Sequence, residues 1–79
     1  MTVVDVYSRQ GCHLCEVLLE ELLELVAGKA TVVVHDVDTR DAWREEYGFD
    51  VPVVEYCGVR LCAHRLDREA VRQALAGVD

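Results

Sequence analysis

The spacing of hydrophobic residues changes several times along this chain, and each change predicts a different element. Residues 3–7 form a valine-rich run without turn residues, which predicts a strand buried on both faces. Over residues 12–27 the apolar positions recur every three or four residues, which predicts an amphipathic helix that Gly28 ends. The predicted core side of this helix consists of Leu18, Leu19, Leu22, Leu23 and Val26.

The next part of the chain repeats this alternation. Residues 31–35 predict a second strand, and because a helix connects it to the first, we expect the two strands to be parallel. Asp38 or Thr39 is placed to cap a short helix that ends near Gly48. On that helix Trp43 and Tyr47 would share one face, which we interpret as packing.

A hairpin and a last helix complete the pattern. The strands 53–56 and 59–63 flank the turn Cys57-Gly58, where glycine supplies a positive φ, and in this register Cys62 lies opposite Val53. The final helix starts at Asp67, whose carboxylate can cap it. Its predicted inward residues are Ala70, Val71, Ala74 and Leu75. The predicted order is β-α-β-α-β-β-α.

Two cysteines lie one helical turn apart where the first strand gives way to the first helix. At this spacing the sulfurs of Cys12 and Cys15 lie on one side of the helix, close enough to form a short-loop disulfide. Free N–H groups of the first turn and the helix dipole favour the Cys12 thiolate, so Cys12 is the predicted nucleophile. Cys15, one turn deeper, is the predicted resolving thiol. The pattern favours thiol–disulfide redox chemistry over half of a zinc site or a pair of inert thiols.

Three motifs carry a resemblance to a known family. Residues 7–15 read Tyr-Ser-Arg-Gln-Gly-Cys-His-Leu-Cys, and they are followed by the acidic stretch 35–38 and by Asp-Val-Pro-Val at 50–53. With these motifs the chain resembles, over nearly its whole length, a small glutaredoxin-like member of the thioredoxin superfamily. The resemblance implies an α/β, thioredoxin-like fold of the glutaredoxin type, with three helices and a four-stranded mixed sheet. It also implies a cis Val51-Pro52 bond that holds the Val51 backbone beside Cys12, where a substrate could pair as an added strand.

Further residues near the cysteines are candidates for a role in the site. Arg9 matches a basic position that in glutaredoxins helps to bind the glutathione carboxylate, with a solvated loop arginine as the alternative. His13 either stabilises the thiolate when protonated or points to water. Asp5 could be a buried proton acceptor, like the carboxylate beneath the active site of thioredoxins.

The chain departs from glutaredoxins that hold glutathione firmly. Those proteins carry Gly-Gly and an acidic residue after the second hairpin strand, whereas residues 61–65 here read Leu-Cys-Ala-His-Arg. The usual proline between the active-site cysteines is replaced by His13. We therefore expect no tightly bound cofactor, and glutathione at most as a weakly bound co-substrate. Cys62 is interpreted as a small buried residue, with a third redox thiol as the alternative, and the spacing of Cys57 and Cys62 disfavours a four-cysteine zinc site.

Composition limits the remaining possibilities. The 79 residues fit one domain spanning 1–79, and no apolar run is long enough to cross a membrane. A net charge of −7 argues against nucleic-acid binding. Much of the negative charge is predicted on the solvated face of the first helix, at Glu16, Glu20, Glu21 and Glu24. No signal peptide is recognisable, so we expect a cytoplasmic protein with reduced cysteines.

These observations predict a glutaredoxin-like thiol–disulfide oxidoreductase. Its expected partners are proteins or small molecules that contain a disulfide, together with a reductant of the thioredoxin or glutathione type, and we expect a monomer. Two alternatives stay open. One is a metal-handling protein that binds an iron–sulfur cluster or zinc through its cysteines, and the other is an interaction module of thioredoxin fold without catalytic turnover.

Overall fold

The strands and helices follow one another along the chain in the predicted order. The computed structural model describes residues 2–77. Its elements are β1 (Val3–Ser8), α1 (His13–Leu25), β2 (Thr31–Asp36), the 3₁₀ turn η1 (Val37–Thr39), α2 (Asp41–Tyr47), β3 (Val53–Tyr56), β4 (Val59–Ala63) and α3 (Arg68–Leu75). In this part of the chain, no helix is both apolar enough and long enough to reach across a lipid bilayer.

The strands form one mixed sheet in the order β2-β1-β3-β4. β1 is central, parallel to β2 and antiparallel to β3, with Val6 opposite both Val34 and Val54. β3 and β4 form the predicted hairpin, in which Cys57 and Gly58 both have positive φ, 51° and 78°. Two successive positive φ values are typical of the tight turns that match the twist of a hairpin.

The predicted hairpin register is wrong beyond the first two pairs. Glu55 pairs with Arg60 as expected, but a bulge follows, and Val54 then pairs with Cys62. Leu61 is the extra residue on β4. Because adjacent residues of a strand point to opposite faces, the bulge brings Cys62 to the face that packs against the main core.

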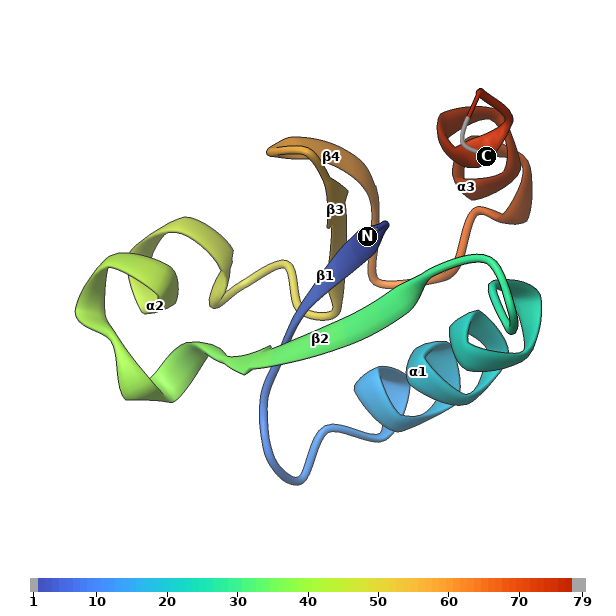
Figure 1. Ribbon diagram of the computed structural model, residues 1–79. Helices are drawn as coiled ribbons and strands as arrows, with labels where there is room; N and C mark the ends of the chain where they lie inside the picture. The colour runs from blue at the N-terminus through green and yellow to red at the C-terminus, as the bar shows by residue number, and fades with distance from the viewer. Residues whose placement is uncertain (1, 78–79) are drawn as a thin grey trace.

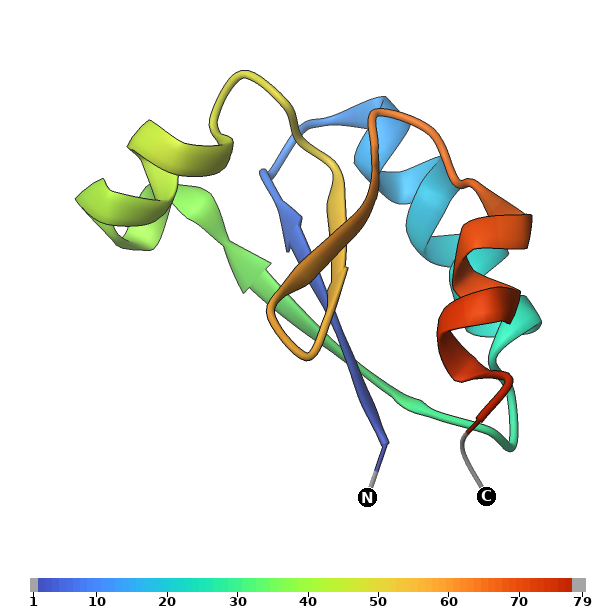
Figure 2. The ribbon, with the colours of Figure 1, turned by 90° about the horizontal axis from the view of Figure 1, so that it is seen from above.

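The helices lie on both faces of the sheet. α1 and α3 cover one face, and α2 lies on the other, as two perpendicular views show (Figures 1 and 2). The main core lies between the sheet and the helices α1 and α3. Its buried members are Val4, Val6, Leu18, Leu22, Val26, Val54 and Val71.

The buried side of α1 is narrower than predicted. Leu18 and Leu22 are fully buried, but Leu23 is 50% exposed, and Leu25 packs against the core instead. Leu23 follows Leu22 by about 100° of rotation, which carries it past the edge of the sheet. Glu21, expected in solvent, is half-buried and pairs with Arg68 of α3 at 3.0 Å.

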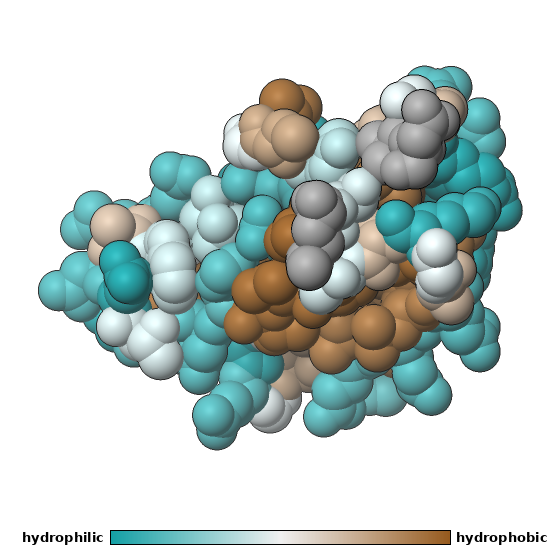
Figure 3. All heavy atoms as spheres, in the orientation of Figure 1, coloured by the Kyte–Doolittle hydropathy of each residue, from teal (hydrophilic) through white to brown (hydrophobic). Residues whose placement is uncertain are grey.

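We predicted that β1 is buried on both faces, but the structure buries only one of them fully. Val4 and Val6 are fully buried towards α1, whereas Val3, Asp5 and Tyr7 are half-buried on the other face. The reason is that α2 has only seven residues and cannot cover that face along its whole length. The edge strand β2 is also open, and Figure 3 shows the hydrophobic surface that it forms together with α1.

The aromatic residues fill the α2 side of the sheet, which confirms their interpretation as packing. Tyr7 stacks between His35 and Tyr47, with ring centroids 4.8 and 3.9 Å away, and Trp43 meets Tyr7 edge-on. The Tyr47 hydroxyl donates a hydrogen bond of 2.8 Å to Glu55. The pKa of Tyr47 is raised, mainly by burial and secondly by this hydrogen bond. Polar atoms on this face are therefore paired inside the aromatic cluster.

Two helix starts differ in how well the sequence predicted them. Asp67 caps α3, and its carboxylate accepts the Ala70 N–H at 3.0 Å, as expected. Neither Asp38 nor Thr39 caps α2, because both belong to η1, whose cap is Asp36. The short helix α2 then begins after Arg40 without a side-chain cap.

The neighbouring residues Leu22 and Leu23 give a direct test of the orientation of α1. We expect Leu22→Ala to lower the free energy of unfolding by about 2–5 kcal/mol, because it leaves a cavity in the core. Leu23→Ala, the matched control, removes a half-exposed side chain and should change it by no more than about 0.5 kcal/mol. Urea unfolding followed by circular dichroism measures both. Equal losses would mean that Leu23 belongs to the core.

Candidate redox site

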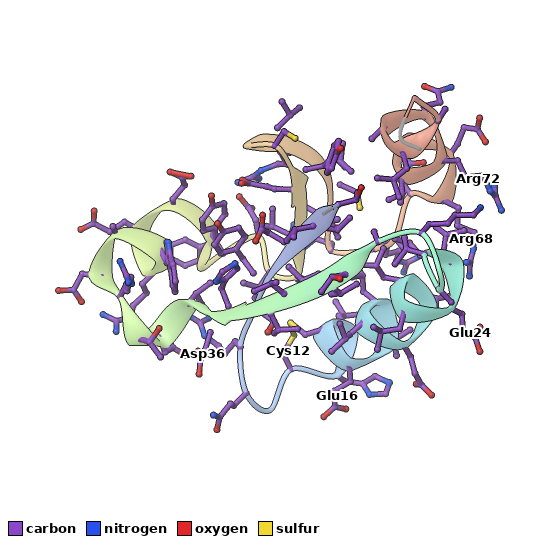
Figure 4. The ribbon with its side chains drawn as sticks, in the orientation of Figure 1. Cys12, Glu16, Glu24, Asp36, Arg68 and Arg72 are labelled. Atoms are coloured by element: carbon purple, nitrogen blue, oxygen red, sulfur yellow. A yellow bond between two sulfur atoms is a disulfide. The ribbon has the colours of Figure 1, made fainter. Side chains whose placement is uncertain are left out.

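Cys12 and Cys15 lie at the start of α1, directly after the loop that leaves the central strand. Cys12 is the N-cap residue, with an extended backbone (φ −100°, ψ 107°), and its Sγ accepts a hydrogen bond from the Cys15 N–H at 3.2 Å. The Cα atoms of the two cysteines are 5.2 Å apart, and their sulfurs form a disulfide (Figure 4). A sulfur thus takes the place that an oxygen of Ser, Thr, Asp or Asn occupies at most helix starts.

The two sulfurs differ in their access to solvent. Cys15 is 4% exposed and packs on the inner side of α1, whereas Cys12 is half-buried at the helix tip. A bulky partner therefore reaches Cys12 before Cys15. The free N–H groups of the first helical turn also surround Cys12, and they favour a negative charge on its sulfur. Both properties agree with the roles predicted for the two thiols.

Four loops meet at the end of the sheet where the cysteines lie. Ser8 pairs with Asp36, and Val53 pairs with both Tyr7 and Ala63. The segments after β1, β2 and β4 and the segment before β3 therefore leave the sheet on the same side. The loop before β3 contains Val51-Pro52, whose peptide bond is cis, as the resemblance implied.

Pro52 connects two of these loops. Its side chain is fully buried, and its carbonyl oxygen accepts the His64 N–H at 2.8 Å. His64 has φ 69°, a left-handed conformation that residues other than glycine rarely adopt. It occupies the region where the resemblance led us to expect glycine. The chain therefore keeps a glycine-like backbone at this point while it adds an imidazole side chain.

The predicted carboxylate ligand Arg9 is engaged within the protein. Its guanidinium contacts Asp38 through two nitrogens, at 2.9 and 3.1 Å, and donates to the Gly48 carbonyl at 3.2 Å. The hydrogen bond from Arg9 holds the pKa of Asp38 below its ordinary value. Arg9 thus ties the loop before Cys12 to η1 and to the end of α2.

Two other predicted residues point away from the sulfurs. The His13 side chain is 85% exposed and lies 3.8 Å from Glu16 on the outer side of α1. Asp5 faces α2 rather than α1, because Val4 and Val6 on either side of it pack against α1. Its carboxylate contacts His35 at 2.8 Å, so it is not a proton acceptor beneath the cysteines.

A groove that was not predicted from the sequence lies beside the cysteines. It has a volume of about 350 Å³ and lies between α1 and the loop after β4. α1 contributes Leu14, Val17, Leu18 and Glu21 to it. The loop contributes His64, Arg65 and Leu66. The one available signal was that Leu14 and Val17 fall on the polar side of the predicted helix.

The remaining cysteines are not bonded to each other. Cys57 is exposed in the hairpin turn, and Cys62 is half-buried against the core, where burial raises the pKa of its thiol. Across residues 2–77, the side chains of His, Cys, Asp and Glu form no group of three or more that could hold a metal ion. The four cysteines therefore comprise one bonded pair, Cys12 and Cys15, and two free thiols.

Comparison with known proteins agrees with this geometry. The family model of the glutaredoxin-like domain (DUF836) matches residues 3–76. Among solved structures, a structural-genomics target protein from X. campestris is 29% identical, with a TM-score of 0.70 over 96% of this chain and 99% of that one. No functionally curated protein matches the chain.

More distant structures share the fold. The germline-specific thioredoxin Deadhead of Drosophila melanogaster is 22% identical, with a TM-score of 0.54 over 99% of this chain and 81% of that one. The holo form of glutaredoxin C1 from Populus tremula x tremuloides is also 22% identical, with a TM-score of 0.51 over 90% of this chain and 73% of that one. These two similarities support a thioredoxin-like fold.

The Arg9–Asp38 pair predicts a dependence of stability on pH. Because the pKa of Asp38 is lowered in the folded state, the ion pair contributes fully above the unfolded pKa of about 3.9, and its contribution disappears as the pH falls through the folded value. We expect Asp38→Asn to be less stable than the parent protein between about pH 5 and 7, and the difference to shrink below about pH 4.

The measurement is the urea midpoint as a function of pH. Asp41→Asn is the matched control, because Asp41 is 90% exposed and pairs only with Arg44. It should show a smaller difference at every pH. A difference for Asp38→Asn that persists unchanged at the lowest pH would contradict the assignment.

Proposed function

This chain belongs to the glutaredoxin-like domain family, and from that membership and its paired cysteines we propose that it is a thiol–disulfide oxidoreductase. The observation that carries the proposal is the asymmetry of the pair at the N-terminus of α1. Cys12 is accessible and lies among free N–H donors, whereas Cys15 is buried one turn deeper with its Cα 5.2 Å away. This is the arrangement that a nucleophilic and a resolving thiol require.

The proposed reaction has two exchange steps. The Cys12 thiolate attacks one sulfur of a substrate disulfide, so that a mixed disulfide forms and the other substrate sulfur leaves as a thiolate that takes up a proton. The Cys15 thiol, having lost its proton, then attacks Cys12 Sγ and releases the second substrate sulfur. Two electrons pass from the protein to the substrate, and the Cys12–Cys15 disulfide remains. An external thiol reductant of the thioredoxin or glutathione type regenerates the dithiol.

We assign the alignment of the substrate to the loop before β3. The Pro52 carbonyl is already occupied by the His64 N–H, so the backbone groups of Val51 are the candidates for pairing with an extended substrate segment. Main-chain pairing of this kind provides affinity with little dependence on side chains. It suits an enzyme that reduces proteins or small molecules of varied sequence.

Glutathione fits the site poorly in this proposal. The donors of Arg9 that would bind a carboxylate are engaged by Asp38 and Gly48. In the loop after β4, His64 and Arg65 replace the glycine and the acidic residue that hold the amino-acid end of the tripeptide in glutaredoxins. A weakly bound co-substrate is therefore the most that we assign to glutathione, and we propose no resident cofactor.

Exchange of each active-site cysteine tests the mechanism. Cys12→Ser should abolish disulfide reduction while the serine oxygen still caps α1. Cys15→Ser should still attack but accumulate a mixed disulfide with the substrate, visible as a mass increase without reductant. Cys57→Ser, the matched control, alters an exposed cysteine of the hairpin turn and should turn over normally. Equal loss in both active-site variants, with no adduct, would contradict the two-step reaction.

The choice of reductant gives a second test. We expect the protein to turn over slowly with glutathione alone and faster with a thioredoxin-type reducing system. His64→Gly combined with Arg65→Asp restores the glycine and the acid, and should raise the glutathione-dependent rate by about fivefold, the effect of one favourable surface ion pair. The assay is reduction of a small neutral disulfide coupled to each system. Rapid turnover of the unaltered protein with glutathione alone would refute the expectation.

A further inference from the structure

The groove beside the cysteines has exposed apolar side chains from the same helix turn that carries the redox pair. Leu14 lies between Cys12 and Cys15 in the sequence and is 47% exposed, and Val17, one turn further along α1, is 39% exposed. Both side chains line the groove, and Leu66 faces them from the loop before α3. A chain bonded to Cys12 therefore has an apolar surface within reach of the residues next to its own cysteine.

The charge in the groove is opposite to the charge of the protein as a whole. The chain carries a net charge of −7, yet no carboxylate of residues 2–77 pairs with Arg65. Glu21, the acidic residue of the groove wall, pairs at 3.0 Å with Arg68, which is labelled in Figure 4. The groove therefore presents one uncompensated positive charge next to the redox site.

Five of the other six arginines have a carboxylate partner. Arg9, Arg44, Arg60, Arg68 and Arg72 each lie within ion-pair distance of an Asp or a Glu. Among residues 2–77, Arg40 and Arg65 lack one, although the chain has almost twice as many acidic as basic residues, 15 against 8. Arg40 instead lies over the Trp43 ring, 4.8 Å from its centroid, so Arg65 is, within these residues, the arginine without a partner that lines this groove. Its charge is thus available to a partner from outside.

The backbone that carries Arg65 is held firmly in place. The Arg65 N–H donates to the Ala63 carbonyl at 2.8 Å, and the preceding His64 N–H donates to the Pro52 carbonyl at 2.8 Å. His64 also lies 3.8 Å from Asp50 in the loop before β3. The turn is therefore attached to the segment to which we assigned substrate alignment, and these hydrogen bonds fix the backbone from which the Arg65 side chain lines the groove.

We propose that this groove selects protein substrates whose reactive cysteine is flanked by an apolar and an acidic side chain. The apolar side chain packs on Leu14 and Val17, and the acidic one pairs with Arg65. This inference rests on the proposed redox function and adds a substrate class to it. A volume of about 350 Å³ is at the small end of ligand sites, and it suits a few side chains of an extended segment.

The test uses short peptides of the form acetyl-X-Leu-Cys-Leu-X-amide, with X as Glu, Gln or Lys. Each cysteine is joined in a disulfide to 2-mercaptoethanol, and both flanks are alike, so that the direction of binding does not matter. The pre-reduced protein supplies two electrons, the peptide thiol and 2-mercaptoethanol are released, and the Cys12–Cys15 disulfide forms. Single-turnover rates against peptide concentration give kcat/KM for each peptide.

The unaltered protein should prefer the Glu peptide over the Lys peptide by about two- to fivefold at low salt, as one surface ion pair allows. Raising the ionic strength should reduce that ratio. Arg65→Gln should bring the ratio close to one, Arg65→Lys should retain part of it, and Arg65→Glu should reverse it. Lys29→Gln is the matched control, because it removes a positive charge from the loop between α1 and β2 and should leave the ratio unchanged.

Two further arms address the groove itself. Replacing Leu by Ser in the peptide should lower kcat/KM in the unaltered protein, and should have a smaller effect in Val17→Ser. A ratio near one in the unaltered protein, or an equal ratio in Arg65→Gln and Lys29→Gln, would overturn the proposal. Loss of the preference at high protein concentration would mean that a second copy of the chain occupies the groove. Competition by S-methylglutathione would mean that glutathione occupies it. Either result would also overturn the proposal.

Failure of this inference is distinct from failure of the proposed function. If the protein oxidises its cysteines equally well with all peptides, the redox function stands and the selection is refuted. If no peptide is reduced at all, and a small neutral disulfide is not reduced either, the redox function itself is refuted.

Discussion

The hydrogen bond from the Cys15 N–H to Cys12 Sγ is the contact on which the site depends. It places a sulfur at the N-cap of α1, where the backbone N–H groups of the first turn have no partner inside the helix. The same atom therefore caps the start of the helix and is the nucleophile in the proposed reaction. Because α1 also supplies Leu18 and Leu22 to the core, the position of Cys12 is fixed by the packing of the whole domain.

The loops around Cys12 are held by polar contacts, because the chain is too small to bury them. Arg9 connects the loop before Cys12 to Asp38 in η1 and to the carbonyl of Gly48 after α2. On the far side of the sheet, Asp5, His35 and Glu55 form hydrogen bonds inside an aromatic cluster. Small domains bury a limited fraction of their surface, so paired polar groups and stacked rings take over part of what a larger core would do.

The sequence was sufficient for the order of the elements and for the redox pair, because both depend on local patterns. Hydrophobic periodicity located the strands and helices, and the spacing of Cys12 and Cys15 indicated the disulfide that the structure shows. What it could not predict depends on contacts between distant segments. The bulge at Leu61 moved Cys62 to the other face, and the shortness of α2 left one side of β1 partly open.

Side-chain roles in the loops were the hardest to predict for the same reason. The role of Arg9 as a carboxylate ligand was predicted from its position three residues before Cys12. Its actual partner, Asp38, lies 29 residues away, and only the fold brings the two together. Asp5 was considered as a possible proton acceptor beneath the cysteines but lies on the other face, since one residue of register decides which face a strand residue occupies. The groove with Arg65 arises from two elements whose contact no local pattern encodes.

The distribution of charge separates two effects that act at different distances. The net charge of −7 repels anionic partners at long range, but at about 0.1 M salt such repulsion fades beyond about 10 Å. Arg65 acts at contact, where screening by salt is weaker and where the hydrogen-bonded turn fixes its backbone. In the proposed reaction, a basic groove next to Cys12 on an otherwise acidic protein therefore discriminates late, after encounter, when the substrate segment already lies over Cys12. Discrimination at that stage affects the reacting complex more than the rate of collision.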